Sequence, residues 1–338
     1  MVALSIVVPC FNEQACLAAL HERLGAAARA AVGEDYEIVL VNDGSRDSSW
    51  RLMREMVADD PNLLAVNLSR NHGHQLALTA GLDLCRGEKI LIIDADLQDP
   101  PELLPDMLKV MQSEGADVVY GVRRSRTGET AFKRATAHAF YRLLSRATEV
   151  DIPVDAGDFR LMSRRALDAL LAMPEQARFI RGMVAWIGFR QVPFAYDRQQ
   201  RFAGETKYPV KKMMRFALDA LTGFSSAPLK VASHVGLWLS LGSVLLILYI
   251  AYAWITGRSI QGWTSLMLIV VVLGAIQMFT LALLGEYIGR LYNEAKRRPL
   301  YIVQEVAGDG RAEARLGYIA DATAKSDKPG GKGKRPTR

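Results

Sequence analysis

Residues 89–102 read KILIIDADLQDPPE, a short apolar run followed at once by a dense group of acidic residues. The run Ile90–Ile93 predicts a buried strand, since four consecutive apolar residues suit a strand that is covered on both faces. Asp94 and Asp96 follow at its carboxyl end, where two like charges repel each other unless a cation or a donor lies between them. The sequence therefore predicts a site for a hard divalent cation, although an isolated Asp-x-Asp is as often a solvated turn or a helix cap.

Two further acidic residues have a structural interpretation. Asp99 precedes Pro100 and Pro101, and this order predicts a helix with Asp99 as its cap and proline in its first turn. We therefore assign Asp99 a structural role. Asp43, in the run Asn-Asp-Gly-Ser, is either part of a ligand site or a turn residue that caps a helix beginning near Asp47.

Apolar runs and helical patterns alternate on both sides of this stretch, through residues 1–205. The runs that predict strands are Leu4–Val8, Glu37–Val41, Leu63–Leu68, Lys89–Ile93 and Asp117–Val122. The helical patterns between them lie near residues 13–31, 47–58, 73–85 and 101–113. Such alternation predicts an α/β domain with a Rossmann-like, mostly parallel sheet that helices cover on both faces.

Polar residues follow the first, second and fourth predicted strands. They are Pro9-Cys10-Phe11-Asn12-Glu13, Asn42-Asp43-Gly44-Ser45 and the acidic residues from Asp94 onward. Ligands bind such sheets at the carboxyl ends of the strands, so we expect these residues to converge at one edge. The sequence contains neither GxGxxG nor GxxxxGK[ST], which argues against a dinucleotide site or a P-loop.

The composition narrows the class of protein. Half of the 338 residues are hydrophobic, and much of that half lies in two uninterrupted runs after residue 230, which argues against an ordinary cytosolic enzyme. The mean hydropathy of +0.07 argues against a disordered chain and against a transporter of many spans. Cys10, Cys16 and Cys85 lack CxxC spacing, so neither a disulfide framework nor a zinc site is expected.

The two apolar runs predict a transmembrane hairpin within residues 231–288. Val231–Ile255 contains no Asp, Glu, Lys or Arg over 25 residues. A helix of that length reaches about 37 Å, against a hydrocarbon core of about 30 Å. Trp263–Leu284 adds 22 residues without formal charge. Two buried core helices are the alternative, but the length and the missing charges favour spanning helices.

Basic residues flank the hairpin on its outer sides, whereas the link between the two runs carries only Arg258. The positive-inside rule therefore predicts a multi-pass protein of the inner membrane with both termini cytoplasmic. Residues 206–230 predict an amphipathic juxtamembrane helix that lies on the bilayer or, alternatively, packs on the globular domain. The sequence also predicts a cytoplasmic segment at residues 289–308 and a disordered basic tail at residues 309–338. The membrane flanks explain the net charge of +6 better than a nucleic-acid partner does.

Six motifs occur together along the chain. They are IVVPCFNE at residues 6–13, VNDGS at 41–45, DADLQDPPE at 94–102, DAGDFRL at 155–161, RGM at 181–183 and RFAGETKY at 201–208. With the two predicted spans, this combination resembles the family 2 glycosyltransferases of GT-A fold, and among them the polyprenyl-phosphate glycosyltransferases. The resemblance covers about residues 3–300. The same resemblance implies that the protein can form a homo-oligomer.

The resemblance implies which residues bind the donor and the metal. The donor-binding residues that it implies are Pro9, Asn12, Glu13, Asp43, Asp94 and Arg123. The metal ligands that it implies, for Mg²⁺ or Mn²⁺, are Asp94, Asp96 and Gln98. Asp96 is catalytic in this scheme because it holds the metal, while Asp94 also faces the ribose and the diphosphate.

The resemblance also implies an acceptor site beside the bilayer. Arg201 and Lys207 would contact the acceptor phosphate there. Asp155 and Asp158 are ambiguous: either residue acts as a base, orients the acceptor or pairs with Arg160. Orientation or pairing is preferred to the base role, and Asp158 is preferred to Asp155.

The chemistry of the implied reaction needs charge neutralisation more than a base. A phosphate monoester has a second pKa near 6, so at about pH 7 it is largely dianionic and already a competent nucleophile. A cation must stabilise the leaving diphosphate, and Arg or Lys must bring one anion toward another. Direct attack by the phosphate would invert the anomeric centre.

We therefore expect inverting transfer of a single sugar from a nucleotide diphosphate sugar, with UDP as the expected nucleotide, to undecaprenyl or another polyprenyl phosphate in the membrane. A processive polysaccharide synthase of the same fold is less well supported, because the chain lacks a Gln-x-x-Arg-Trp sequence. The alternative from another class is a non-catalytic membrane scaffold or lipid-binding adaptor with a degenerate transferase domain.

Overall fold

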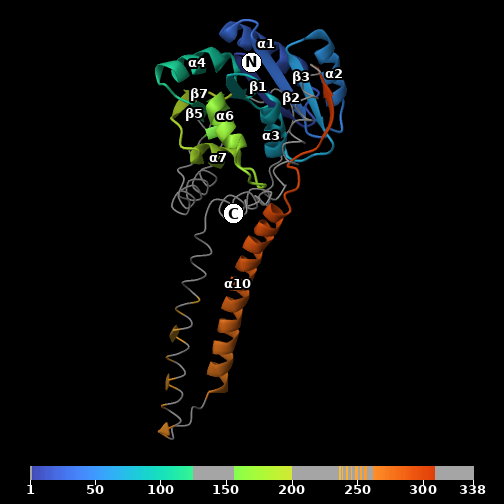
Figure 1. Ribbon diagram of the computed structural model, residues 1–338. Coiled ribbons are helices and arrows are strands. Elements are labelled where there is room, and N and C mark those ends of the chain that lie inside the picture. Colours follow the sequence, from blue (N-terminus) through green and yellow to red (C-terminus); the bar gives the residue numbers. More distant parts are fainter. Residues whose placement is uncertain are drawn as a thin grey trace, which may run out of the picture.

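The computed structural model describes residues 2–124, 156–199 and 262–308, together with scattered positions between 236 and 256. An α/β domain forms one end of the molecule, and a long helix, α10 (Trp263–Ala295), extends away from it (Figure 1). The predicted juxtamembrane helix at residues 206–230 and the predicted tail at 309–338 lie outside the described residues.

A mixed sheet of eight strands organises the described part of the domain. The strand order across the sheet is β7 (Gln191–Tyr196), β5 (Val118–Arg123), β6 (Ala156–Ser163), β4 (Lys89–Ile92), β1 (Leu4–Cys10), β2 (Tyr36–Asn42), β3 (Leu63–Leu68) and β8 (Val303–Ala307). The block β4-β1-β2-β3 is parallel, and so is the pair of β5 and β7. β6 runs antiparallel to β4 and β5, and β8 runs antiparallel to β3. The predicted parallel pairing therefore holds for the central block, within a sheet that is mixed.

All five predicted strands form, with ends that lie within two residues of the prediction; β3 has the predicted ends. The structure adds β6, β7 and β8, which the sequence analysis did not predict. Each of them pairs with a strand that is distant along the chain; for example, Ala307 of β8 is opposite Ala65 of β3. Local patterns do not report such pairings, because the partner lies outside the window in which periodicity is read.

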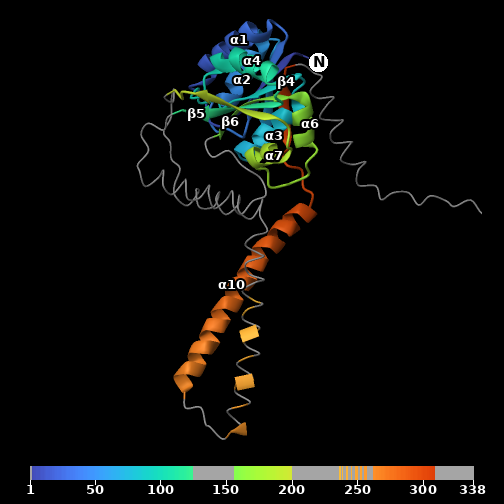
Figure 2. The same ribbon diagram turned by 90° about the vertical axis from the view of Figure 1, so that its left-hand side faces the viewer.

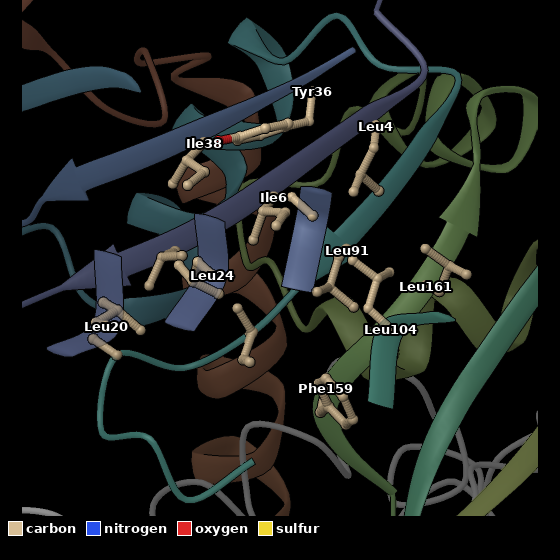
Figure 3. Close-up of a cluster of buried hydrophobic side chains, with 14 of the residues drawn as sticks. Leu4, Ile6, Leu20, Leu24, Tyr36, Ile38, Leu91, Leu104, Phe159 and Leu161 are labelled. Carbon is tan, nitrogen blue, oxygen red and sulfur yellow. The ribbon is translucent and has the colours of Figure 1, made fainter. Parts of the chain in front are cut away.

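Helices cover both faces of the sheet. One face carries α1 (Leu17–Val32), α2 (Ser49–Asp59) and α4 (Leu104–Ser113), and the other carries α3 (His74–Leu84), α6 (Arg164–Leu171) and α7 (Ile180–Trp186). Successive strand residues point to opposite faces, so Ile6 of β1 lies in the first core (Figure 3) and Val7 lies in the second. Burying a side chain of this size contributes about 1.5–3 kcal/mol, which makes the sheet a rigid support for the loops at its edge.

Helix α10 contains the second predicted span, Trp263–Leu284, and continues 11 residues beyond it. Within the described residues, one helical segment, Val272–Ala295, is long and apolar enough to cross a membrane, and none of its most apolar window is buried. The first predicted span, Val231–Ile255, lies mostly outside the described residues. Those of its positions that are described are helical, and large side chains among them, such as Trp238 and Tyr249, are exposed. The two-span topology therefore stays a prediction.

Polar contacts join the C-terminal end of α10, which is the end predicted to be cytoplasmic, to the α/β domain. Glu294 accepts a hydrogen bond from the backbone N–H of Gln176, with an N–O distance of 2.9 Å. The chain then runs along the domain to β8, and on the way the Tyr301 hydroxyl donates to Asp83 at 2.7 Å. Both views show α10 leaving the domain at the end where α3 and α7 lie (Figure 2).

Candidate functional site

The carboxyl ends of the central strands gather several residues that the sequence analysis singled out. Asn12 and Glu13 follow β1, Asp43 follows β2 and Asp94 follows β4. Asp158 lies in β6, which crosses the end of β4 in the antiparallel direction, with Arg160 opposite Ile92. The sheet topology thus places Asp158 beyond the end of β4, on the side where Asp94 lies.

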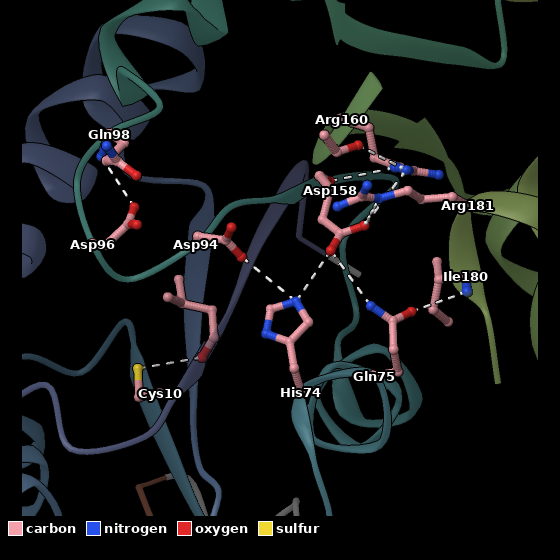
Figure 4. Close-up of polar contacts among 12 residues, drawn as sticks. Cys10, His74, Gln75, Asp94, Asp96, Gln98, Asp158, Arg160, Ile180 and Arg181 are labelled. Carbon is pink, nitrogen blue, oxygen red and sulfur yellow. Dashed lines mark hydrogen bonds and ion pairs between the residues drawn. The ribbon is translucent and has the colours of Figure 1, made fainter. Parts of the chain in front are cut away.

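His74, the first residue of α3, lies between these two carboxylates (Figure 4). Its Nε2 atom is 3.2 Å from Asp158 Oδ2 and 3.6 Å from Asp94 Oδ1. Ligand atoms of the three side chains all lie within 4.8 Å of one another. Helix α3 rests directly on the sheet, because a Cβ at Gly81 would approach Val7 Cγ1 to 2.4 Å. This close packing fixes His74 at the junction of β4 and β6.

Asp158 is a buried carboxylate that is fully engaged by donors. The Arg181 guanidinium donates to Oδ1 at 2.8 Å, and the Gln75 amide reaches Oδ2 at 3.4 Å. Arg160 Nη2 lies 3.8 Å from Oδ1. Burial alone would raise the pKa of Asp158, but the charge of Arg181 and the hydrogen bonds from His74 and Arg181 outweigh it and hold the pKa well below its usual range. An anion held so firmly is a weak proton acceptor, which favours pairing and orientation over the base role.

Asp94 is less well compensated. Its Oδ1 atom is buried and accepts no hydrogen bond from the described residues. Burial, with the charges of Asp158, Asp99 and Asp96, raises the pKa of Asp94 to about 6, although His74 opposes the rise. A hard divalent cation takes carboxylate oxygens as ligands and would supply the missing positive charge. The donor set at this edge therefore fits a metal ion.

The acidic loop, residues 94–99, holds its conformation through its own polar groups. Asp96 is buried and accepts a hydrogen bond from the backbone N–H of Gln98 at 3.2 Å. Leu97, between them, has a φ of 56°, in the left-handed region that few residues other than glycine adopt, and its side chain is buried. Strain of this kind persists only where the surroundings overdetermine the loop.

Asp99 does not cap the following helix, so that prediction was wrong. The 3-10 turn η1 (Pro101–Leu103) that leads into α4 begins after Pro100 and has no side-chain cap, although proline does stand in its first turn. Asp99 is instead buried, accepts a hydrogen bond from the Tyr196 hydroxyl and lies 3.4 Å from Arg198 Nε. The partner is 97 residues away in the chain, so the local sequence did not indicate it.

Asp43 does not cap α2 either. Helix α2 begins after Ser48 without a side-chain cap. The Asp43 carboxylate accepts the backbone N–H groups of His72 and Gly73 at 2.7 and 2.9 Å, and burial raises the pKa of Asp43 in spite of these bonds. Asp43 therefore holds the loop that leads into His74.

The loop after β1 is bonded to the loop after β2. The Asn12 side chain accepts from Arg46 N at 2.8 Å, and its own backbone N–H donates to Ser45 Oγ at 2.9 Å. Glu13 N donates to Ser49 Oγ at 3.0 Å, and Pro9 is buried within β1. These residues form a continuous rim beside the acidic loop.

The remaining predicted residues lie at the end of β5 or outside the described residues. Arg123 ends β5, and its buried Nε atom has no hydrogen-bond partner among the described residues. Asp155, Arg201 and Lys207 fall outside the described part of the chain. Their predicted roles stay predictions.

Sequence reasoning missed His74 and Gln75 as site residues and assigned no role to Arg181. A signal for the histidine was present, since Ser69–His74 is a polar stretch that follows the third strand at the same edge of the sheet.

Comparison with known proteins shows clear relatives. The family described as Glycosyl transferase family 2 matches residues 5–171. The uncharacterized glycosyltransferase YkcC of Bacillus subtilis (strain 168) is 47% identical over 90% of this chain and 94% of its own length. The prophage bactoprenol glucosyl transferase homolog of Escherichia coli (strain K12) is 37% identical over 90% of this chain and 99% of its own. The bactoprenol glucosyl transferase of Shigella phage SfV is 35% identical over 89% of this chain and 98% of its own length.

Proposed function

The chain belongs to glycosyl transferase family 2, and from that premise we propose that it transfers one sugar from a UDP-sugar to undecaprenyl phosphate or another polyprenyl phosphate. The transfer takes place at the cytoplasmic face of the membrane and yields a polyprenyl-phosphate-sugar. Relatives named bactoprenol glucosyl transferase support the acceptor, because their similarity extends over nearly the whole of both chains.

The observation that carries the proposal is the contrast between two neighbouring carboxylates. Asp158 is saturated by donors, whereas Asp94 has a buried oxygen without a hydrogen bond from the described residues. This pair lies at the carboxyl edge of an α/β sheet, where such folds bind phosphate-containing ligands. The domain also carries α10, whose exposed apolar surface suits an enzyme that meets a lipid acceptor.

Asp94, Asp96 and Gln98 would hold Mg²⁺ or Mn²⁺. A bound divalent cation stabilises the negative charge that develops on a leaving diphosphate. Asn12, Glu13 and the other rim residues would bind the nucleoside. Arg123 would neutralise phosphate charge with its guanidinium.

The acceptor phosphate needs no strong base, since it is already largely dianionic at about pH 7. This agrees with an Asp158 whose lone pairs are occupied by Arg181, His74 and Gln75. In the proposed scheme Asp158 fixes these cationic and polar groups around the reacting centre. Arg201 and Lys207 bind the acceptor phosphate, and in-line attack inverts the anomeric centre.

The proposed domain organisation follows from the same scheme. Residues 1–205 form the cytoplasmic transferase domain, residues 206–230 lie at the membrane surface and residues 231–288 cross the bilayer twice. Residues 289–308 return to the domain, as β8 does in the described structure. An anchored enzyme holds its site at the depth where the lipid phosphate lies, which raises the effective concentration of the acceptor.

The test is sugar transfer by the full-length protein in detergent. Radiolabelled nucleotide sugars, each with undecaprenyl phosphate and Mn²⁺ or Mg²⁺, are screened for label in the lipid extract, with Asp96→Ala beside the wild type. Transfer by the wild type that Asp96→Ala loses supports the proposal. Equal incorporation by both proteins would remove metal-assisted catalysis. A wild type inactive with every donor would favour the alternative of a lipid-binding scaffold.

A further inference from the structure

Tyr196, the last residue of β7, contacts every described segment that carries a predicted catalytic or phosphate-binding residue. We propose that Tyr196, acting through Asp99, is a positioning residue that holds the acidic loop and the segment leading to Arg201 in one arrangement. The inference rests on the proposed function, because the acceptor role of Arg201 is part of it. Tyr196 itself has no assigned contact with substrate.

The hydroxyl group of Tyr196 reaches the acidic loop. It donates a hydrogen bond to Asp99 Oδ1, and both side chains are buried, with 3% and 1% of their surfaces exposed. Arg123 lies opposite Tyr196 in the pairing of β5 with β7, and its charge opposes the rise in the pKa of Tyr196 that burial causes. A buried bond to a charged acceptor is costly to lose, since the carboxylate cannot recover the partner from water. The hydroxyl thus links the acidic loop to the end of β7, which pairs with the end of β5.

The ring of Tyr196 packs beside the Asp158 strand. It meets Phe159 edge to face, with ring centroids 5.4 Å apart and an interplanar angle of 62°. Phe159 is the neighbour of Asp158 in β6. Gly121 of β5 leaves room for the pair, because a Cβ there would lie 2.7 Å from Tyr196 Cε1 and 2.8 Å from Phe159 Cδ1. The ring is therefore held by two strands, independently of its hydroxyl.

The residues after Tyr196 continue the contact with the acidic loop. Arg198 Nε lies 3.4 Å from Asp99 Oδ1. Gln199 N donates to the Gln98 carbonyl at 2.9 Å, and Arg23 Nη2 reaches the Gln199 side chain at 3.3 Å. Segment 196–199 is thus bonded along its length to the loop that carries Asp96 and Gln98. It ends two residues before Arg201.

These contacts hold the acidic loop and segment 196–199 in a fixed position relative to each other. The metal side of the proposed site and the chain leading to its acceptor side are anchored on the same Asp99 carboxylate. Removing the Tyr196 hydroxyl keeps the ring on Phe159 but releases one anchor. The acidic loop retains its internal bond between Asp96 and Gln98, so donor binding should change little while acceptor use suffers.

The test compares two buried tyrosines in the full-length protein. Tyr196→Phe removes the hydroxyl that Asp99 accepts. Tyr36→Phe is the matched control, because Tyr36 is 2% exposed and its hydroxyl accepts from Arg29 Nη1 at 2.9 Å, at the start of β2 and away from the site. Steady-state kinetics with undecaprenyl phosphate, Mn²⁺ and the nucleotide sugar that the wild type uses give kcat and separate KM values for donor and acceptor.

We expect Tyr196→Phe to lower kcat/KM for the acceptor about tenfold, with the donor KM within about twofold of the wild type. Tyr36→Phe should leave all three constants unchanged. Asp99→Asn keeps an oxygen that can accept from the Tyr196 hydroxyl. Its kcat/KM for the acceptor should therefore stay closer to the wild-type value than that of Asp99→Ala. The double variant Tyr196→Phe/Asp99→Ala should lose no more than Asp99→Ala alone, because both changes break one linkage.

Equal acceptor constants for Tyr196→Phe and Tyr36→Phe would overturn the inference while leaving the proposed function intact. A wild type that transfers no sugar to undecaprenyl phosphate would overturn both. Thermal unfolding of each variant identifies a misfolded protein. If Tyr196→Phe does not fold, the acceptor kcat/KM values of Asp99→Ala and Asp99→Asn test the inference instead. Equal values for those two variants would count against it.

Discussion

The Nε2 atom of His74 lies 3.2 Å from Asp158 Oδ2, although the two residues are 84 positions apart in the chain. The contact joins the first turn of α3 to β6 at the edge of the sheet. The same nitrogen faces Asp94, so one imidazole separates two carboxylates whose electrostatic surroundings differ. Much of the behaviour expected of the site follows from this arrangement.

Replacing His74 should impair turnover without unfolding the protein. His74→Ala leaves the two carboxylates facing each other without the partner that orients them, and we expect kcat to fall by about 10–100-fold. His74→Gln, which can place an amide N–H near the same point, should recover part of the loss. The control is His21→Ala, because His21 also pairs with an aspartate, Asp60 at 2.7 Å. Equal kcat values for His74→Ala and His21→Ala would contradict the prediction.

Replacing Asp94 should stabilise the metal-free protein while abolishing transfer. The folded-state pKa of Asp94 is raised from 3.8 to about 6, so the folded state binds the extra proton between those values. Stability then decreases as the pH rises through this window. Asp94→Asn has no charge to bury and should be more stable by about 1–3 kcal/mol at about pH 7, an advantage that disappears near about pH 4.

Urea unfolding of the metal-free protein across this pH range measures the effect. Asp106→Asn is the control, since Asp106 is an exposed residue of α4 that pairs with Lys109. Unfolding free energies of Asp94→Asn that stay below the wild type at every pH would show that Asp94 stabilises the fold.

Replacing Asp158 should have the opposite effect on stability. Asp158→Asn leaves Arg160, which is 3% exposed, and Arg181 without their anion, and the free energy of unfolding should fall by about 3 kcal/mol. Because the folded-state pKa of Asp158 is lowered, the wild type holds this contribution above the unfolded pKa and loses it as the pH falls below about 4. Asp168→Asn, which removes the exposed partner of Arg164 at 3.8 Å, should cost less than about 1 kcal/mol. Similar losses for both variants would argue that Asp158 is not held as described.

Divalent cations should stabilise the wild type and leave the acidic-loop variants unaffected. Mn²⁺ at about 100 times its Kd would add about 2.7 kcal/mol, and EDTA should remove the effect together with transfer. In Asp94→Asn and Asp96→Asn the melting temperature should not respond to the metal. A full Mn²⁺ shift in both variants would place the metal elsewhere.

Changing Gly121 should disturb the frame around Tyr196. Gly121→Ala puts a Cβ within 2.8 Å of both Tyr196 and Phe159, and we expect a loss of about 1–3 kcal/mol in stability. Gly25→Ala is the control, because the atoms nearest to its Cβ would belong to the flexible Arg29 side chain, at 3.3 Å and beyond. Calorimetry of both variants measures the difference, and equal melting temperatures would show that the rings can move apart.

Part of this protein is determined by local sequence. The runs around Ile6, Ile38 and Ile90 form strands because each presents consecutive apolar residues that two helical layers can cover. Asp94 lies at the carboxyl end of its strand because it follows that run directly. Helix α10 is indicated by the 22 residues Trp263–Leu284, which carry no formal charge. Such features need only neighbours along the chain, so periodicity and composition report them.

The tertiary structure alone decided which side chains meet. β6 enters antiparallel between β4 and β5 and brings Asp158 to Asp94, and α3 places His74 between them. Asp99, expected to cap a helix, is bonded to Tyr196 of β7 instead. The physical reason is that a carboxylate's partner and pKa depend on burial and on donors from distant segments. Chain folding sets both, and no local pattern encodes them.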